Sequence, residues 1–469
     1  MKVILVIADT LRRDHTGVLG NPPWWKIQTP TLQRFSQIAS VFENAYIGSF
    51  PTIPNRRDTL LGKCDGVKPF NRGTLLTKSE VSFPAHLKRS GIPSMLIMDT
   101  PYLAFNDRNL YRDFSAWYWN RGQEGELCWL DQEVELKYDV PPELIRYDES
   151  RYHSILTNRY RRKIETDWFA PGTYTKAMEW LECNYKRSDF FLWIDTFDPH
   201  EPWDPPQYYI DLYDKDYEGR IFESPAVGLR KKMGITDREL KQMRARYSAE
   251  VTMVDTWFGR LLDKVEQLGI MDETVIIFTT DHGTNLDGPG DCGMVLKNPF
   301  LSAEGVNLSK GILHGYSDNG ICMPLTINTV RIPLFIYAPG LKAVRTNEIT
   351  QPWDLNSTIL DFFNVKPADQ ENEILGRSLK PVLEGKSIKS KEYAICGNNN
   401  LIQGINKKWF LTIWRKYKKP CLIDLENDPA CENNVFKENP QVVKEIYSHI
   451  EKYVTGQGLD IAKLELVLD

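Results

Sequence analysis

The chain has 469 residues, a formal net charge of -5 and 42% hydrophobic residues. This length exceeds the usual size of a single domain, and the hydrophobic fraction is large enough for a substantial core. The acidic balance excludes a generally basic surface for nucleic acid, but a local pocket of Arg and Lys could still bind an anionic substrate.

Eight cysteines are present, without a Cys-x-x-Cys pair and without regular spacing. Neither a zinc cage nor a disulfide framework is therefore indicated. No segment reaches the ~20 apolar residues of a membrane span, and the apolar run at the N-terminus is too short for a signal peptide. We therefore expect a cytoplasmic protein with reduced cysteines and no membrane contact.

Short apolar runs typical of buried strands recur along the first 340 residues, with helical patterns between them. The predicted strands cover residues 1–8, 41–47, 94–98, 190–194, 274–280 and 332–337. The predicted helices cover residues 29–38, 52–61, 78–89, 173–184, 237–268 and 353–363. Such an alternation predicts an α/β fold with a mostly parallel, doubly wound sheet flanked by helices.

Three stretches interrupt this alternation. Residues 105–170 are rich in Trp, Tyr, Arg and Glu without a clear period, which predicts an irregular insertion that walls a pocket. Residues 209–234 have the composition of a surface loop. Residues 284–323 contain Gly, Asn, Asp and Pro throughout, which predicts a long loop of the kind that often carries function.

The last part of the chain has a different pattern. From about residue 390, short runs predict a small antiparallel sheet, and a helix is expected over residues 440–453. We divide the chain into a large domain of residues 1–385 and a small C-terminal α+β subdomain of residues 386–469. No internal repeat or low-complexity segment is present.

Two of the predicted buried strands end in side chains that bind metals. The first leads directly into Asp9, and the strand over residues 274–280 leads into Asp281, His282 and Gly283. In open parallel sheets, the carboxyl ends of the strands deliver side chains to a site. An isolated Asp-His-Gly is weak evidence, but the set favours a metal centre over structural residues.

A stretch from Ser49 to Gly62 places Thr52 between two prolines. Pro54 suits the first turn of a helix and Gly62 suits its end. The N–H groups and the positive end of this helix would face a group attached to Thr52, and Arg56 could reach back as a two-pronged anion donor. The alternative is an ordinary proline-rich turn with surface arginines.

Several motifs stand together in one order along nearly the whole chain. They are Asp9-Thr-Leu-Arg, Thr52-x-Pro-x-Arg56, Asp198-Pro-His200-x-Pro-Trp203, Asp281-His-Gly, His314-Gly315 before Arg331-Ile-Pro-Leu334, and the tail Leu422-Ile-Asp-Leu-Glu-Asn-Asp-Pro429. In this order they resemble the motifs of sulfatase-like hydrolases of the alkaline phosphatase superfamily. The resemblance implies that residues 1–385 form a metal-dependent hydrolase domain.

The resemblance implies one divalent metal ion on Asp9, Asp281 and His282, with Thr52 as a further ligand. Sulfatases of the family commonly carry Asp-Asp and Asp-Asn at the two strand ends, a set that suits calcium. Here Thr10 follows Asp9, and His282 follows Asp281. One carboxylate fewer and one imidazole more favour Mn, Zn or Fe, while Ca and Mg stay open.

The resemblance also assigns roles around the metal. Thr52 is the nucleophile, Arg56 orients it and neutralises charge, and His200 contacts the substrate's oxygens or its leaving group. His314, with Lys310 nearby as a rival, protonates the leaving group. Two further substrate contacts are expected at Asn71 and Thr100. A second cation, held by Asp195, Asp198, His200 and His314, stays open as an alternative.

The residue at position 52 decides the expected reaction. Family sulfatases have Cys or Ser there, which is oxidised to formylglycine, whereas relatives with Thr form a phospho-threonine. We therefore expect hydrolysis of small phosphodiesters or phosphonate monoesters through a phospho-Thr52 intermediate. The alternatives are a sulfatase without formylglycine and a non-catalytic binding protein on the same fold. A homo-oligomer is compatible with the sequence.

Overall fold

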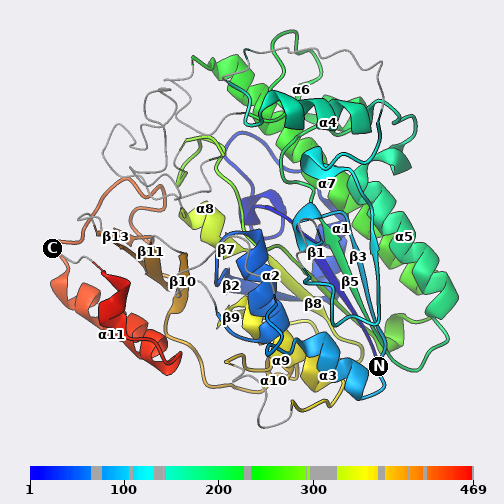
Figure 1. Ribbon diagram of the computed structural model, residues 1–469. Helices are drawn as coiled ribbons and strands as arrows, with labels where there is room; N and C mark the ends of the chain where they lie inside the picture. The colour runs from blue at the N-terminus through cyan, green and yellow to red at the C-terminus, as the bar shows by residue number, and fades with distance from the viewer. Residues whose placement is uncertain are drawn as a thin grey trace.

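The computed structural model describes residues 1–64, 76–104, 109–130, 141, 144–225, 234–291, 293–295, 325–367, 375–398, 401–415 and 420–466. Two sheets organise these residues, with helices around them (Figure 1). No helix within these ranges combines the length and the apolar character that a membrane crossing requires.

The larger sheet has nine strands in the described residues, in the order β4-β3-β5-β1-β6-β8-β2-β7, with β9 beside β2. Their bounds are β1 (Lys2–Ala8), β2 (Ser40–Tyr46), β3 (Ser94–Met98), β4 (Ala116–Trp119), β5 (Phe190–Thr196), β6 (Thr274–Thr279), β7 (Arg331–Ile332), β8 (Leu334–Tyr337) and β9 (Arg345–Thr350). The five strands from β4 to β6 are parallel, and β8 lies antiparallel to β6. The expected mostly parallel sheet is confirmed, with antiparallel pairing around β2, β7 and β8.

Both faces of this sheet are covered, as a doubly wound fold requires. In β1, Val3, Leu5 and Ile7 enter one core, and the alternate residues Ile4, Val6 and Ala8 enter the other. The first core includes α2 (Thr52–Leu61), α3 (Phe83–Arg89) and α9 (Pro352–Phe362). The second includes α1 (Pro30–Ile38), α5 (Phe169–Asn184) and the 31-residue α7 (Asp237–Gln267). Continuous apolar runs such as β1 therefore mark strands that are buried on both sides.

Parts of the predicted irregular segments have regular structure. Within residues 105–170, β4 forms an edge of the large sheet and α4 (Glu149–Arg159) is a helix of 11 residues. Within the predicted loop of residues 209–234, α6 (Gln207–Asp214) packs against α7. The prediction of irregular structure was wrong for these elements. β4 is an exposed edge strand without the alternation that identifies a strand. The helix α6 is short and rich in aromatic and acidic residues, so its apolar face gives no clear helical period.

The smaller sheet is antiparallel, with the order β10-β11-β12-β13, as the sequence predicts. Its strands are β10 (Ala394–Asn398), β11 (Leu401–Ile405), β12 (Trp409–Trp414) and β13 (Cys421–Asp424). Phe410 of β12 joins the core of the large sheet, whereas its neighbour Leu411 packs toward α11 (Pro440–Gly456). This sheet therefore lies between the large sheet and α11 (Figure 1). Two further short helices in the described residues are α8 (Ile327–Val330) and α10 (Lys380–Leu383).

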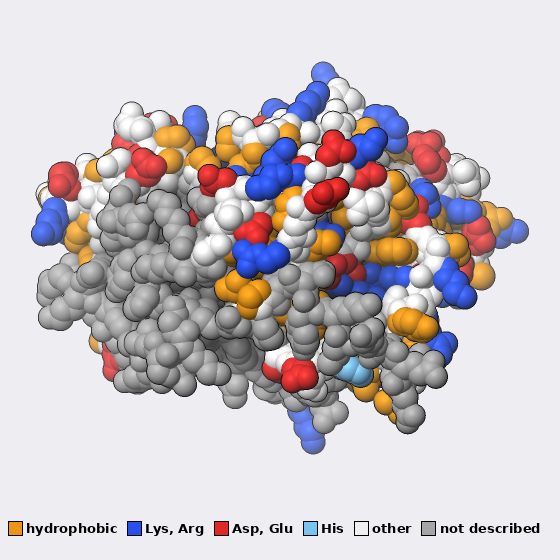
Figure 2. Space-filling view, turned by 90° about the horizontal axis from the view of Figure 1, so that it is seen from above, with side chains coloured by type: hydrophobic (Ala, Val, Ile, Leu, Met, Phe, Trp, Pro, Cys, Tyr) orange, Lys and Arg blue, Asp and Glu red, His pale blue; other side chains and the backbone are white. Residues whose placement is uncertain are grey.

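The surface seen from above in Figure 2 mixes charges on the part that is coloured. Lys and Arg side chains stand among Asp and Glu side chains there, without a continuous basic stripe. This mixture agrees with the small net charge of the sequence.

Candidate active site

The predicted metal ligands meet at the carboxyl edge of three neighbouring strands. Asp9 follows β1, Asp281 follows β6, and Asp195 belongs to the end of β5, where it pairs in register with Ile7. Potential ligand atoms of Asp9, Asp281 and His282 all lie within 4.8 Å of one another, and all three side chains are buried. Because β1 lies between β5 and β6, residues far apart in sequence converge on one point.

The backbone fixes the orientation of His282. Its Nδ1 lies 2.9 Å from the carbonyl oxygen of Gly283, which can only accept, so Nδ1 carries the proton. Nε2 is then the nitrogen that can bind a metal, and it lies 3.4 Å from Asp281 Oδ2. The ring of Phe50 packs against the imidazole, with 4.8 Å between centroids. With Nδ1 bound to the backbone, the imidazole of His282 has the orientation that a metal-binding histidine needs.

Arg56 holds three carboxylates in a fully buried ion cluster. Its Nε and Nη2 lie 2.8 Å and 2.9 Å from the two oxygens of Asp195. Its Nη1 lies 2.8 Å from Asp281 Oδ2, and its Nη2 lies 3.3 Å from Asp9 Oδ2. The guanidinium therefore neutralises part of the negative charge at the ligand group, which is one of the two roles expected for Arg56.

Thr52 begins the helix that carries Arg56 into this cluster. Thr52 is the first residue of the helix and is 7% exposed, and Gly62 ends the helix with a φ of 68°. One turn after Thr52, Asn55 Nδ2 donates to the carbonyl oxygen of Asp281 at 2.9 Å. Along the chain, Thr52 thus stands between two residues that contact the ligand group. Phe50 contacts His282, and Arg56 contacts Asp9 and Asp281.

A strained residue follows Asp9. Thr10 is fully buried and has a φ of 58°, a left-handed conformation that is rare for a β-branched residue. Its N–H donates to Asp281 Oδ1 at 3.1 Å, and its carbonyl accepts from the Tyr247 hydroxyl at 2.8 Å. Its own hydroxyl is buried without a hydrogen-bond partner among the described residues. Such strain is maintained only where the surroundings over-determine the conformation.

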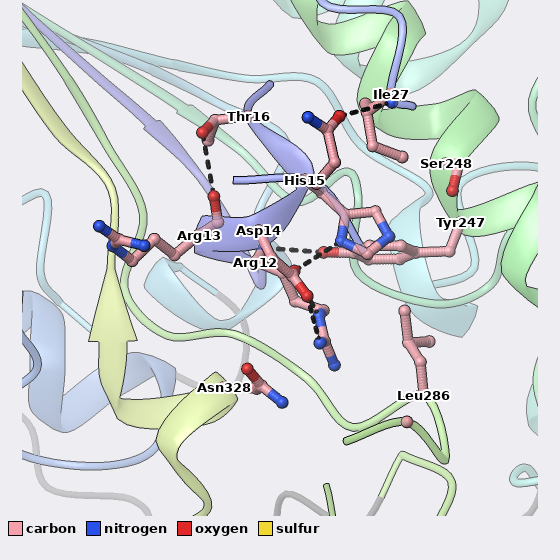
Figure 3. Close-up of polar contacts among 12 residues, drawn as sticks. Arg12, Arg13, Asp14, His15, Thr16, Ile27, Tyr247, Ser248, Leu286 and Asn328 are labelled. Atoms are coloured by element: carbon pink, nitrogen blue, oxygen red, sulfur yellow. Dashed lines mark hydrogen bonds and ion pairs between the residues drawn. The ribbon is translucent and has the colours of Figure 1, made fainter. Parts of the chain in front are cut away.

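The residues after Thr10 fix this loop through polar contacts, several of which are drawn in Figure 3. Arg12 is 1% exposed and pairs with Asp14 and with both oxygens of Asp291, and its N–H donates to the Tyr247 hydroxyl at 2.8 Å. Asp14 also lies 2.7 Å from Nδ1 of the buried His15. Ion pairs and α7 thus anchor the segment from Thr10 to His15.

Two further predicted residues are buried, and one of them contacts the cluster. His200 is 5% exposed, and its Nδ1 lies 2.6 Å from the carbonyl oxygen of Glu201. Thr100 is fully buried and donates to Asp195 Oδ1 at 2.5 Å. The observed contact of Thr100 is therefore to the carboxylate that binds Arg56.

The remaining predicted site residues, Asn71, Lys310 and His314, lie outside the described residues. Sequence reasoning did not identify Asn55, Thr10 or the partnership of Asp195 with Arg56. No local pattern predicts these contacts, and the sequence suggests Asp195 only as a ligand of the alternative second cation. Only the pairing of β5 with β1 places it beside Arg56.

The electrostatics of the ligand group favour a cation. Burial alone would raise the pKa of Asp281, but the neighbouring His282, Arg56 and Asp9 side chains and the hydrogen bond from the Thr10 N–H hold this pKa well below its usual range. Three buried carboxylates (Asp9, Asp195 and Asp281) share one guanidinium, so a divalent ion would balance the remaining negative charge.

The donor set fits such an ion. Two carboxylates supply hard oxygen ligands, and the Nε2 atom of His282 supplies a borderline ligand, a combination accepted by Mn, Zn or Fe. In the described residues this is the one group of three or more ligand side chains that converges in this way. Asp198, expected in the alternative second cation site, accepts instead from Gln123 Nε2 at 3.0 Å and from the Ala170 N–H at 3.3 Å.

Comparisons with known proteins identify the family of this chain. The model of the Sulfatase family matches residues 2–365. The arylsulfatase of Clostridium perfringens is 24% identical over 97% of this chain and 96% of its own length. The N-acetylglucosamine-6-O-sulfatase of Bacteroides thetaiotaomicron is 33% identical over 77% of this chain and 67% of its own length.

Solved structures show the same fold. The phosphonate monoester hydrolase of Agrobacterium radiobacter superimposes with a TM-score of 0.69 and 18% identity, over 98% of this chain and 96% of that one. The family model covers well over half of the chain, and its members are metal-dependent ester hydrolases. The chain therefore belongs to the sulfatase family of the alkaline phosphatase superfamily and is a hydrolase of ester bonds.

Proposed function

We propose that this protein hydrolyses small phosphodiesters or phosphonate monoesters, with Thr52 as the nucleophile. The observation that supports the proposal most is Thr52 itself, a secondary hydroxyl on the first residue of α2, the helix whose Arg56 contacts Asp9 and Asp281 of the ligand group. Threonine cannot give the aldehyde that formylglycine-dependent sulfatases use. The fold shared with a phosphonate monoester hydrolase is compatible with this reading.

The proposed reaction has two steps. The Thr52 hydroxyl loses its proton to solvent and its oxygen attacks phosphorus, so that a bond from phosphorus to Thr52 forms while the bond to the leaving oxygen breaks. The leaving oxygen takes up a proton, for which His314 is the donor that the family resemblance implies. Water then attacks phosphorus, breaks the bond to Thr52 and restores the hydroxyl. A phosphodiester substrate thereby gives a phosphate monoester, and a phosphonate monoester gives a phosphonate.

The residues of this chain contribute in different ways. Arg56 fixes Asp9, Asp195 and Asp281 and lowers the local negative charge. The N-terminal end of α2 offers N–H groups to an anionic ester at Thr52. A divalent cation on Asp9, Asp281 and His282 would supply positive charge that stabilises an ionised hydroxyl and the transferring group.

A second candidate is a sulfatase that works without formylglycine. The observation that favours it is that the two curated relatives described above are both sulfatases. The two candidates share the fold, the ligand group and Thr52, and they differ in the ester that is transferred.

The test is a panel of aryl phosphodiester, aryl phosphonate and aryl sulfate esters with metal-loaded protein. We expect phosphodiester or phosphonate turnover to exceed sulfate turnover, and Thr52→Ala to abolish it, whereas Thr52→Ser retains part of it because the hydroxyl stays. Dominant sulfate turnover would establish the second candidate. Full activity of Thr52→Ala would refute both, since each needs this side chain.

A further inference from the structure

The structure links His200 to the insertion through Glu201. We propose that Arg146 is a positioning residue: it holds Glu201, and through Glu201 it fixes the imidazole of His200 for the reaction. The inference rests on the proposed function and on the role that the family resemblance implies for His200, a contact with the substrate or its leaving group. Nothing in the sequence motifs includes Arg146, which belongs to the segment predicted as an irregular insertion.

The orientation of His200 depends on the backbone of Glu201. Its ring stacks on Phe197 with centroids 4.0 Å apart and 25° between planes. Its Nδ1 lies 2.6 Å from the Glu201 carbonyl oxygen, which can only accept, so the proton is on Nδ1. The nitrogen that can exchange a proton with a substrate or a leaving group is then Nε2. A displaced Glu201 would turn this atom away.

Glu201 needs a cation to stay in place. Its side chain is 0% exposed, and a buried carboxylate is costly unless it is paired. Arg146 forms an ion pair with Glu201 Oε1 through Nη1, while the other carboxylate oxygen lies 3.5 Å from Nδ1 of His200. The Tyr147 hydroxyl lies 3.3 Å from the Glu201 carbonyl oxygen. Two consecutive residues of the insertion therefore contact both the side chain and the backbone of Glu201.

Arg146 is itself held firmly. Its N–H donates to the Ser224 carbonyl at 2.9 Å, and its neighbour Ile145 forms an antiparallel bridge with Pro225. Its Nη2 lies 3.8 Å from Glu124 Oε1, which also lies 3.0 Å from the Tyr147 hydroxyl. Burial would lower the pKa of Arg146, but Tyr147, Glu124, Tyr102 and Asp9 raise it above its usual value, so the guanidinium stays charged.

The chain offers a matched control in Arg151. Both guanidinium groups lie over the ring of Tyr147, at 5.6 Å for Arg146 and 5.4 Å for Arg151. Both side chains come from the insertion, but the ion pair with Glu201 belongs to Arg146. A general effect of positive charge near the pocket should therefore appear in both variants, and a positioning effect only in one.

The experiment compares Arg146→Gln, Arg146→Lys and Arg151→Gln in the metal-loaded full chain, with the ester that it turns over fastest. We expect Arg146→Gln to lower kcat about 10-fold or more with little change in KM, because a misplaced imidazole affects the transition state more than ground-state binding. Arg146→Lys should recover part of the loss, and Arg151→Gln should stay near the parent. In a His200→Ala background, Arg146→Gln should have little further effect.

Glu201→Gln gives a second route to the same answer. A neutral amide no longer requires the guanidinium, so Arg146→Gln combined with Glu201→Gln should lose less activity than Arg146→Gln alone. If Arg146→Gln does not fold, the double variant is compared with Glu201→Gln instead, and the added Arg146→Gln change should then have little further effect on activity. Nitrogen NMR of His200 adds a readout without turnover: the Nδ1–H tautomer should be lost in Arg146→Gln and kept in Arg151→Gln.

Equal losses for Arg146→Gln and Arg151→Gln would overturn the proposal, and so would a full further loss in the His200→Ala background. A KM effect alone would instead make Arg146 a substrate contact and would also overturn it. Failure of the proposed function is recognised separately, because it appears as activity retained by Thr52→Ala or as dominant sulfate turnover. Neither result affects the His200 tautomer.

Discussion

Arg56 is the residue on which the buried charges of the site depend. Three carboxylates contact its guanidinium, and all four side chains are 0% exposed. In the metal-free protein, Arg56→Met would leave these carboxylates without the cation that they share. We expect the free energy of unfolding, measured by urea denaturation, to fall by about 3–5 kcal/mol.

The control for this prediction is an exposed ion pair of the same type. Arg345 is 50% exposed and pairs with Glu43 at 2.9 Å, so Arg345→Met should cost less than about 1 kcal/mol. An excess of a divalent ion should reduce the loss in Arg56→Met, because the ion offers the carboxylates another positive charge. A loss no larger than that of Arg345→Met would show that the cluster is not held by this residue.

At the scale of the element, α2 depends on how it ends. Gly62 closes the helix with a φ of 68°, and its N–H donates to the Asp58 carbonyl at 2.9 Å. A Cβ is strained in this left-handed conformation, so Gly62→Ala should lower the free energy of unfolding by about 1 kcal/mol. Chemical denaturation measures this loss.

The matched control is Gly456, at the end of α11. A Cβ there would meet nothing within 4 Å, and its φ is not positive. Gly456→Ala should therefore be neutral or slightly stabilising, because alanine restricts the unfolded chain. Similar losses at both positions would mean that the left-handed end of α2 carries no particular strain.

A carboxylate of α7 makes the contact with α1 dependent on pH. Asp255 accepts from the N–H groups of Thr31 at 2.9 Å and Leu32 at 2.8 Å. Burial raises the pKa of Asp255 from 3.8 to about 6, although these hydrogen bonds oppose the rise. Between these two values the folded state binds more protons than the unfolded state, so stability falls as pH rises from about 4 to about 6.

The free energy of unfolding should fall by at most about 3 kcal/mol for a rise in the pKa of Asp255 from 3.8 to about 6. Asp255→Asn keeps an oxygen that can accept from α1 but cannot titrate. Its free energy of unfolding should therefore fall less between pH 4 and 6 than that of the parent, when both are followed by urea denaturation across this range. Parallel pH profiles for the two proteins would assign the decline to other groups.

At the scale of the whole molecule, the sequence predicts what local patterns encode. The apolar runs of β1 and β6 mark strands buried on both faces, and the polar residues that follow them identify Asp9 and Asp281. Their convergence across 272 positions follows from the parallel pairing of neighbouring strands. The order of the motifs predicts that Thr52 and Arg56 belong to the same site.

The rest depends on contacts that no local pattern encodes. β4 lacks the alternation of a half-buried strand, because its residues lie at the edge of the sheet, and Trp117 is 43% exposed. The link from Arg146 to Glu201 joins the insertion to the loop after β5, and neither segment has a period that predicts it. Side chains that support a site from a neighbouring element are therefore recognised only in the folded structure.

Metal binding is the property by which the whole molecule can be tested. A cation that binds only the folded protein adds about 2.7 kcal/mol of stability at 100 times its Kd. For protein stripped by a chelator, Mn, Zn or Fe ions should therefore raise Tm by a few degrees. Ca and Mg ions should raise it less, because an imidazole among the ligands suits the transition metals better.

The source of this shift can be assigned with two aspartates. Asp281→Asn removes a carboxylate from the ligand group and should abolish the rise in Tm. Asp354 is equally buried and pairs with Lys391 at 2.6 Å, outside that group, so Asp354→Asn should lower Tm with and without metal and leave the rise intact. Calorimetry of the two variants, each with and without metal, separates a loss of metal binding from a loss of stability. A rise that persists in Asp281→Asn would place the cation elsewhere, and no rise with any ion would remove the basis for a metal-dependent reaction at Thr52.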